Sequence, residues 1–526
     1  MQRCGTGGRA DALAGEILGP SENVGHLLWQ VSRIPGPGLR RKVPVVIVGG
    51  GMAGLFAGWK LARAGFHEFE TLELEPECGG NSRFGQNHVT AYPWGAHYVP
   101  LPTPESRAVR ELFVELGIIQ GHSPGGEPVY EEKYLCFSPQ ERLYRHGRWQ
   151  EGLLPLLAVS RKDLEQYDRF RDLVADYRSR RGQDGRRAFA IPIEFSSRDR
   201  ELLELDRISM REFLSRNGFD SVPLHWYVNY ACRDDYGTDY ADVSAWAGIH
   251  YFASRGTGDS KEIESSTVLT WPEGNGWFVQ RLRTLLAKQI RPNSLVYRLG
   301  QGTRSVWADY FDVQSGQSVR VEGEQAIVAC PRRFAARLLS EAKPGAHGAD
   351  AFEYAPWLVA NLTLRAFPAE RAGVPLAWDN VIYDSPSLGY VVATHQSLRT
   401  HLPETVFTYY YPLSAPNPHQ ERKRLLETDW ASWSQFILKD LAKPHPEIDR
   451  LVTRLDLFRW GHAMVRPKPG FLWGTARRQA AQPIGGIRFA HSDLSGFSIF
   501  EEAQYRGVLA AEQTLEALRI PFVSSL

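Results

Sequence analysis

The chain of 526 residues lacks the cysteine pattern of a disulfide-rich or zinc-binding protein. Its five cysteines, Cys4, Cys78, Cys136, Cys232 and Cys330, are far apart, and no CxxC pair or Cys/His cluster occurs. A zinc site needs closely spaced ligands, and a disulfide framework needs an even set of cysteines in a small chain. We therefore expect isolated buried thiols and no metal centre.

The chain also lacks an excess of charge of either sign. It has 61 Lys and Arg against 60 Asp and Glu, for a net charge of +1. Nucleic-acid binders neutralise phosphates with a basic surplus, so no nucleic-acid partner is expected. The 43% hydrophobic and 23% charged residues are ordinary values for globular proteins. At roughly 150 residues per domain, the length predicts about three domain equivalents.

A membrane span and a signal peptide are both missing. The uncharged run 43–59 approaches the roughly 17–25 residues of a span. It contains a β-branched stretch at 45–48 and three adjacent glycines, and glycines disfavour a helix interior. A strand, a turn and a helix over 52–64 are predicted instead. Residues 1–38 lack the apolar segment of roughly 7–15 residues that a signal peptide needs. We expect a cytoplasmic protein, or an exported one if an upstream signal is missing from this chain.

A glycine-rich turn after the first predicted strand fits G-x-G-x-x-G. In this motif Gly49 permits a tight turn, Gly51 lets the backbone approach a pyrophosphate, and Gly54 lets the helix pack on the strand. The helix N-terminus, at Met52 and Ala53, presents free N–H groups and a partial positive charge to phosphates. The turn therefore predicts a dinucleotide site.

An acidic residue completes this unit. The next predicted strand, 69–73, ends in a carboxylate about 20 residues past the glycines, where it can accept both hydroxyls of a ribose. Glu73 and Glu75 both qualify. The spacing to the following Gly79-Gly80 pair favours Glu73.

The segment 79–83, Gly-Gly-Asn-Ser-Arg, resembles the second glycine pair and arginine of FAD-binding flavoproteins, namely the flavin amine oxidases and phytoene-desaturase-like proteins. In that family the segment passes under the FAD pyrophosphate, and the arginine helps to neutralise it. Segments 95–98, 271–276, 326–331 and 488–493 resemble later motifs of the family in the expected order. The resemblance spans roughly residues 42–515 and favours FAD over NAD.

The resemblance implies a set of FAD-binding residues. They are Gly49, Gly51, Met52, Ala53, Gly54, Glu73, Gly79, Gly80, Asn81, Ser82, Arg83, Gly95, Ala96, His97, Asp493 and Phe500. Asp493 would hold a hydroxyl on the flavin side, and His491 stands where the family has glycine. The helix that begins near Glu501 would direct its N-terminus at the flavin. Non-covalent FAD is implied, because no cysteine lies in this C-terminal motif.

The expected fold is α/β. It combines a Rossmann-like FAD domain, a parallel sheet with helices built from discontinuous segments, with a mixed sheet-and-helix substrate domain of amine-oxidase type. The predicted segments are 1–41, an arm or linker; 42–110, 255–335 and 459–526, the three parts of the FAD domain; and 111–254 and 336–458, the two parts of the substrate domain. Further helices are predicted within 104–118, 161–187 and 420–441, and strands at 294–299, 306–313 and 326–330.

Four residues are candidates for the reacting side of the flavin. Tyr410 lies in a strand-like run of tyrosines, and Trp460 and His462 precede the last FAD strand. Monoamine and polyamine oxidases carry a lysine, linked through water to the flavin, at the position that Asn361 resembles. An asparagine supplies no charge there, so slow reaction with oxygen and another electron acceptor are expected.

The leading hypothesis is an FAD-dependent oxidoreductase of the amine-oxidase superfamily that removes a hydride from a small molecule, possibly at CH–NH. A carotenoid or isoprenoid desaturase-like enzyme with a non-oxygen acceptor is one alternative, and a flavin-binding protein without turnover is another. The acidic segment 234–239 lacks the distant glutamate of a calcium loop. We interpret it as a turn that ends a helix; the alternative is that its acids select a cationic substrate. Substrate, electron acceptor and oligomeric state stay open.

Overall fold

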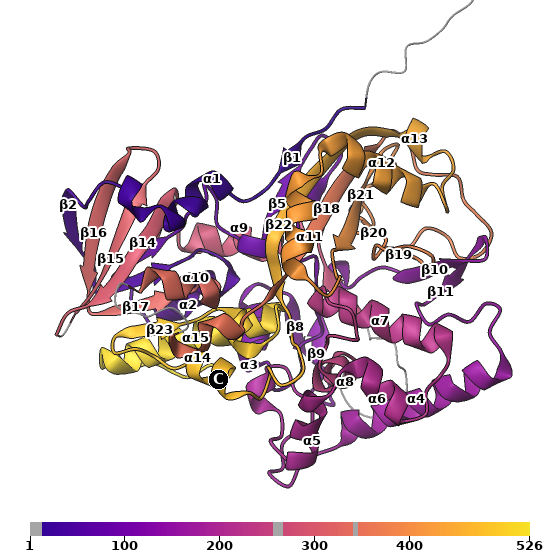
Figure 1. The fold of residues 1–526 in the computed structure, drawn as a ribbon, viewed down its shortest axis with the longest axis horizontal. Coiled ribbons are helices and arrows are strands. Elements are labelled where there is room, and N and C mark those ends of the chain that lie inside the picture. Colours follow the sequence, from indigo (N-terminus) through magenta and orange to yellow (C-terminus); the bar gives the residue numbers. More distant parts are fainter. Residues whose placement is uncertain (1–12, 256–266, 304, 340–345) are drawn as a thin grey trace, which may run out of the picture.

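A parallel five-stranded sheet forms the centre of the first half of the molecule in the computed structural model, which describes residues 13–255, 267–303, 305–339 and 346–526 (Figure 1). Its strand order is β13-β4-β3-β17-β23. The strands are β3 (Val45–Val48), β4 (Phe69–Leu72), β13 (Ile290–Arg291), β17 (Gln325–Val328) and β23 (Ile487–Phe489). Chain segments far apart in sequence therefore build one sheet, as the discontinuous α/β fold predicts.

Helices cover this sheet. They are α2 (Met52–Arg63), α3 (Arg107–Glu115), α9 (Gly276–Leu285), α10 (Arg332–Leu338) and α15 (Phe500–Ala517). Helices α2 and α15 pack so closely that a Cβ on Gly507 would lie 2.3 Å from the Ala53 carbonyl oxygen, and glycine at this position permits the contact. The rings of Phe56 and Phe500 meet edge to face at 5.3 Å in the same interface. This contact sets the N-terminal ends of both helices side by side.

A four-stranded sheet, called the β-meander below, lies beside the parallel sheet, at the left of Figure 1. Its strand order is β14-β15-β16-β2; the first three strands are antiparallel, and β2 pairs parallel to β16. The strands are β14 (Ser294–Gln301), β15 (Val306–Asp312), β16 (Gln317–Gly323) and β2 (Leu39–Lys42). Of these, β14 and β15 match the strands predicted at 294–299 and 306–313.

A mixed eight-stranded sheet forms the second half, with order β1-β22-β18-β21-β20-β19-β10-β11. The strands are β1 (Ile17–Leu18), β10 (Glu141–Arg145), β11 (Arg148–Glu151), β18 (Tyr354–Leu364), β19 (Asp379–Ile382), β20 (Tyr390–Val392), β21 (Thr405–Pro412) and β22 (Val452–Val465). The even-numbered residues of β18 face a core with α11 (Pro418–Glu427), α12 (Trp430–Leu441) and α13 (Ile448–Leu451). The odd-numbered residues point to the other face of the sheet.

A group of helices lies on that other side, at the lower right of Figure 1. They are α4 (Arg161–Ser179), α5 (Arg200–Glu204), α6 (Met210–Arg216), α7 (Val222–Tyr236) and α8 (Ala245–Ala253). A capping box between Ser160 and Asp163 starts α4, which ends before the predicted limit of 187. Helix α7 ends at Tyr236 with Gly237 in the left-handed region at φ 57°. The predicted turn after 234–236 is therefore confirmed.

The first described residues do not behave as a simple linker. Strand β1 pairs with β22 of the eight-stranded sheet, and β2 pairs with the β-meander. Between them run α1 (Glu22–Gly25) and the short 3-10 helices η1 (His26–Trp29) and η2 (Val31–Arg33). The segment 13–42, called the arm below, thus connects both halves across the molecule (Figure 1).

The remaining elements are short. The strands are β5 (Phe84–Gln86), β6 (Ala91–Pro93), β7 (Tyr98–Pro100), β8 (Ile119–His122), β9 (Pro128–Tyr130) and β12 (Val268–Thr270); the helices are η3 (Gly80–Ser82), η4 (Glu132–Tyr134), η5 (Ile193–Phe195), η6 (Leu205–Arg207), η7 (Ala346–Ala351), α14 (Thr475–Ala480) and η8 (Ser492–Ser495). No helix in the described ranges is long and apolar enough to cross a membrane. Nor does any group of three His, Cys, Asp or Glu side chains in those ranges have the placement of a metal site.

Candidate active site

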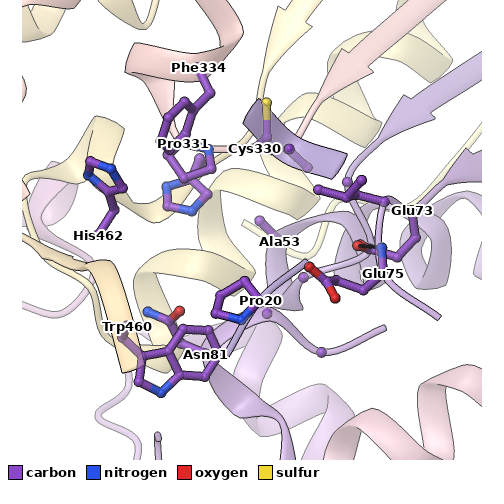
Figure 2. Close-up of a pocket in the computed structure, with 18 of the residues that line it drawn as sticks. Pro20, Ala53, Glu73, Glu75, Asn81, Cys330, Pro331, Phe334, Trp460 and His462 are labelled. Atoms are coloured by element: carbon purple, nitrogen blue, oxygen red, sulfur yellow. Dashed lines mark hydrogen bonds between the residues drawn. The ribbon is translucent and has the colours of Figure 1, made fainter. Parts of the chain in front are cut away.

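A cavity of about 440 Å³ opens at the carboxyl ends of β3, β4 and β17. Ligands of open α/β sheets bind at this edge. Figure 2 shows the larger cavity with Glu73 and Glu75 on one side, Trp460 and His462 on the other, and Ala53 and Pro20 between them. The cavity is therefore long enough to separate an acidic end from an aromatic end.

The glycine turn forms the floor of this larger cavity. Gly49 has φ 101°, and a Cβ on Gly54 would lie 1.9 Å from the Gly49 carbonyl oxygen. A Cβ on Gly51 would meet nothing closer than the Gly80 Cα at 3.9 Å, so it would project into open cavity. The first turn of α2 has no side-chain cap, and Met52 and Ala53 line the cavity. The free N–H groups of this turn can bind a pyrophosphate. Gly54 does not line the cavity and instead allows the helix to pack closely.

Glu73 and Glu75 have different partners. The Glu73 carboxylate accepts the Gly50 N–H at 2.5 Å and the Glu75 N–H at 2.8 Å. Burial raises its pKa above the ordinary glutamate value. Glu75 accepts the backbone N–H and the hydroxyl of Ser21, each at 2.8 Å, and pairs with Arg83 at 3.2 Å. Both acids line the cavity, but Glu75 is already held by side-chain partners.

The second glycine pair lies against the first. Gly79 and Gly80 have φ of 136° and 54°, and the Gly79 N–H donates to the Gly50 carbonyl at 2.9 Å. Asn81 and Ser82 follow on the cavity wall. Arg83 does not line the cavity, so its predicted contact with a pyrophosphate needs correction. Its guanidinium turns to Glu75 instead, because that carboxylate offers a half-buried ion pair.

Of the two residues predicted from the C-terminal motif and the helix after it, Phe500 lines the cavity and Asp493 does not. His491, Ser492 and Phe500 line the cavity, whereas Asp493 is fully buried behind the wall. The Asp493 carboxylate accepts the Arg332 N–H at 2.7 Å and the Tyr354 hydroxyl at 2.5 Å. The predicted contact of Asp493 with a flavin-side hydroxyl is thus corrected. Helix α15 begins at Phe500, as expected, with its N-terminal turn at the cavity.

Residues of the arm also line the larger cavity, which the sequence did not indicate. They include Pro20, Ser21, His26 and Trp29. The Trp29 ring also contacts Phe334 of α10 edge to face at 6.2 Å. The arm therefore forms one wall of the larger cavity.

A second, inner cavity of about 140 Å³ adjoins the first. Residues lining both cavities form a shared wall, and they are Asn81, Ala96, Asn275, Trp460, Ser498, Ile499 and Phe500. The Asn81 amide donates to the Ala463 carbonyl at 2.5 Å, which fixes it at this wall. A dinucleotide in the larger cavity would present its far end to the inner cavity at this wall.

Aromatic rings form much of the inner cavity. His97 stacks on Tyr410 at 4.5 Å, and the Tyr410 hydroxyl donates to the Gly95 carbonyl at 2.9 Å. The Trp460 indole donates to the Trp94 carbonyl at 2.6 Å. Burial lowers the pKa of His97 to about 4, so its ring is neutral at pH 7. Gly95, His97, Tyr410 and Trp460 all line the inner cavity, while His462 lines only the larger cavity.

Asn361 lines neither cavity, and its predicted place beside the reacting centre is corrected. It is on the same face of β18 as Trp357 and Val359, which do line the inner cavity. Asn361 lies two residues further along, where it donates to the Pro93 carbonyl at 3.0 Å and accepts the Thr408 hydroxyl at 2.6 Å. Pro93 of β6 thus packs against Asn361.

Five charged residues line the inner cavity, and no sequence motif predicted that most of them would lie close together. They are Asp234, Asp235, Arg255, Asp379 and Glu501. Arg255 donates to both oxygens of Asp235 at 2.6 Å. Asp234 and Asp235 come from the acidic segment that the sequence singled out, while Asp379 begins β19 with no flanking signal.

Comparisons with known proteins fit this architecture. The family model of the NAD(P)-binding Rossmann-like domain matches residues 47–116. An L-amino acid oxidase of Bothriechis schlegelii is 41% identical over 75 residues, 14% of each chain. The chain thus matches only a small part of the length of this curated relative.

Solved structures match over most of the chain. Putrescine oxidase bound to putrescine has a TM-score of 0.64 at 16% identity, covering 91% of this chain and all of that one. Cyclohexylamine oxidase from Brevibacterium oxydans has a TM-score of 0.64 at 14% identity, with the same coverage. A fatty acid isomerase from P. acnes has a TM-score of 0.62 at 16% identity, covering 89% of this chain and 98% of that one. The chain therefore shares the fold of these three enzymes.

Proposed function

We propose that the chain is an FAD-dependent oxidoreductase that removes a hydride from a C–H bond, beside nitrogen, of a small molecule. The observation that carries this proposal is the shared wall between the larger cavity, which opens at the glycine turn, and the smaller inner cavity. Neighbours with this fold include two amine oxidases, but also a fatty acid isomerase. Since one fold hosts several chemistries, the site must decide among them.

The residues of the larger cavity suit FAD. The bare Gly51 floor and the α2 N-terminus suit a pyrophosphate, and Glu73 suits a ribose. The second glycine pair extends the cavity toward Asn81 and Trp460, where a flavin ring would meet the inner cavity. When bound there, FAD supplies the hydride acceptor.

The residues of the inner cavity position the substrate and exclude water. Buried rings such as His97, Tyr410 and Trp460 shield the reacting bond from solvent. The carboxyls of Asp234 and Asp379 make a purely apolar substrate unfavourable, because an apolar group against them would displace water without replacing its hydrogen bonds. This supports an amine over the isoprenoid of the desaturase alternative.

We further propose that oxygen is a poor electron acceptor. No lysine lines either cavity within the described ranges; the arginines that do are Arg255, which is held by Asp235, and Arg422 and Arg459 of the larger cavity. A lysine of the kind that amine oxidases carry beside the flavin is therefore missing from the lining in these ranges. The free thiols Cys78, Cys136, Cys232 and Cys330 suit the reducing cytoplasm, which we propose as the location.

The test is anaerobic mixing of the purified yellow protein with a panel of primary and secondary amines. Loss of the oxidised flavin absorbance within minutes would support the proposal, and reoxidation by a quinone should outpace reoxidation by air. Alcohols of the same length serve as controls. A protein that binds FAD but is bleached by no amine would contradict amine oxidation, and bleaching by a polyene instead would support the desaturase.

A further inference from the structure

Basic side chains from four elements gather at one side of the larger cavity. Figure 2 shows His462 across this cavity from Glu73 and Glu75. The basic side chains on the His462 side, called the basic cluster below, are His26 of η1, Arg333 of α10, His419 and Arg422 of α11, and His462 of β22. Of these, His26, Arg422 and His462 line the cavity.

Ring contacts join the arm, α10 and β22 within this cluster. The Trp29 ring of the arm lies 5.7 Å from the His26 ring and 6.2 Å from the Phe334 ring, edge to face in both cases. Phe334, the neighbour of Arg333 on α10, meets the His462 ring edge to face at 5.1 Å. Segments far apart in the sequence therefore bring these basic residues to one place.

Arg422 brings α11 to the same place and has no counter-charge there. Its Nε donates to the Gly461 carbonyl of β22 at 2.6 Å, and its Nη1 lies 3.4 Å from the Nδ1 of His419. Burial, and then the charge of Arg333, lower the pKa of Arg422 to about 10, and no carboxylate in the described ranges opposes them. A half-buried arginine beside a second arginine is unfavourable unless an anion neutralises them.

His462 contributes a polar atom without a partner. Its Nδ1 is buried and has no hydrogen bond to any described residue. Burial, and then the charges of Arg422 and Arg333, lower the pKa of His462 to about 3, so the ring is neutral at pH 7. A neutral imidazole can carry its hydrogen on Nδ1 and donate it to an oxyanion. Two independent features, the uncompensated arginine and the unpartnered ring nitrogen, thus call for the same kind of ligand.

The acids of the larger cavity do not neutralise the basic cluster. In the described ranges the lining acids are Glu22, Glu73 and Glu75. Glu75 pairs with Arg83, and the charged neighbours of Glu73 are Glu75 and Arg83. Glu22 is exposed and shifts the pKa of neither Arg422 nor His462. The cluster also shares no residue with the two glycine turns at which the pyrophosphate of FAD is expected.

We propose that the basic cluster binds an oxyanion, the phosphate or carboxylate group of a second ligand that is separate from FAD. Arg422 is held in place through its Nε, and its Nη groups present further N–H donors of the kind that pair with either group. His26, Arg333 and His419 are exposed, so the ligand reaches the cluster from solvent. The inference goes beyond the proposed function and needs no reaction at the flavin.

The experiment is equilibrium dialysis of the FAD-saturated protein against radiolabelled inorganic phosphate in a buffer of low ionic strength at pH 7. We expect one phosphate per chain, with a dissociation constant of about 1 mM or below. Unlabelled citrate is the competing probe. Displacement of phosphate by citrate at comparable concentrations would support a site for carboxylates, and phosphate binding that citrate does not disturb would support a site for phosphates.

Arg422→Gln should weaken phosphate binding at least about tenfold, because hydrogen bonds to charged groups are strong. Arg333→Gln changes an exposed side chain that folding does not require, and it should weaken binding about threefold. Lys423→Gln is the matched control, because Lys423 carries the same charge on the same helix, is exposed and lines neither cavity. It should leave the affinity within about twofold.

Three results would overturn the inference. The first is the absence of bound phosphate from the FAD-saturated protein, and the second is an equal loss in the Arg422 and Lys423 variants. The third is phosphate that binds only the apoprotein and is displaced by FAD, because the cluster would then belong to the nucleotide site. A protein that takes up no FAD but binds phosphate through Arg422 would instead contradict the proposed function and support the second site.

Discussion

Ser21 of the arm holds Glu75 of the nucleotide motif through two hydrogen bonds of 2.8 Å, one from its backbone N–H and one from its hydroxyl. The contact joins residues 54 positions apart and seats the arm on the larger cavity. Because β1 and β2 anchor the arm on both sides, this contact closes one wall across a bound dinucleotide. The arm is then part of the proposed cofactor site.

Removing the Ser21 hydroxyl should loosen that wall. Ser21→Ala retains the backbone N–H bond and loses the other, so we expect a cost of about 1 kcal/mol and FAD dissociation about fivefold faster. Ser32→Ala is the control, because Ser32 is exposed on the same arm. Release of flavin fluorescence after dilution measures the rate. Identical dissociation rates in the two variants would show that the Ser21 hydroxyl does not help to retain FAD.

Glu73 should matter more to FAD affinity than Glu75. Glu73→Ala removes the buried acceptor for a ribose, which should weaken FAD binding by about tenfold to a hundredfold. Glu75→Ala frees the arm and Arg83 but leaves that acceptor in place. Equilibrium titration of the apoprotein with FAD measures both. A larger loss in the Glu75 variant would show that the ribose acid has been misassigned.

Substitutions at Gly51 and at Gly54 should affect different properties, FAD binding in the first case and folding stability in the second. Gly51→Val adds a side chain to open cavity, so the apoprotein should keep its melting temperature and lose FAD binding. Gly54→Ala places a Cβ 1.9 Å from the Gly49 carbonyl oxygen, which should cost about 1–3 kcal/mol of folding free energy. Thermal unfolding and FAD titration of both apoproteins distinguish the effects. Parallel losses in both assays for Gly51→Val would argue against its role at the phosphates.

FAD should be released by acid, even though Cys330 lines the larger cavity. Burial raises the pKa of the Cys330 thiol to about 12, so it stays protonated and unreactive at pH 7. Precipitation with trichloroacetic acid should leave the yellow colour in the supernatant for both the native protein and Cys330→Ser. Colour that remains in the native pellet but not in the variant would identify a covalent bond to Cys330.

Local features of the site could be predicted from the sequence because adjacent residues build them. The turn from Gly49 to Gly54, its flanking strand and helix, and Glu73 all lie within one strand-turn-helix-strand unit. The turn after Asp234 was predictable because Gly237 can adopt positive φ.

The positions of Asn361, Asp493 and Asp379 depend on packing between distant segments, which the sequence does not show. The resemblance to the lysine-bearing strand of amine oxidases pointed to Asn361, but the Asn361 amide is held by the Pro93 carbonyl and lines neither cavity. Asp493 was expected at the cofactor, yet Tyr354 and Arg332 hold its carboxylate behind the wall. Asp379 carries no motif and becomes part of a site only because β19 joins the eight-stranded sheet near α7.

The central claim is that the larger cavity binds FAD. Titration of the apoprotein with FAD and, separately, with NAD tests it most directly, with bound ligand measured by equilibrium dialysis and by the flavin spectrum. The account predicts one FAD per chain, a perturbed flavin spectrum, and no competition from a hundredfold excess of NAD. Tight NAD binding, or no FAD binding by a folded apoprotein, would contradict it.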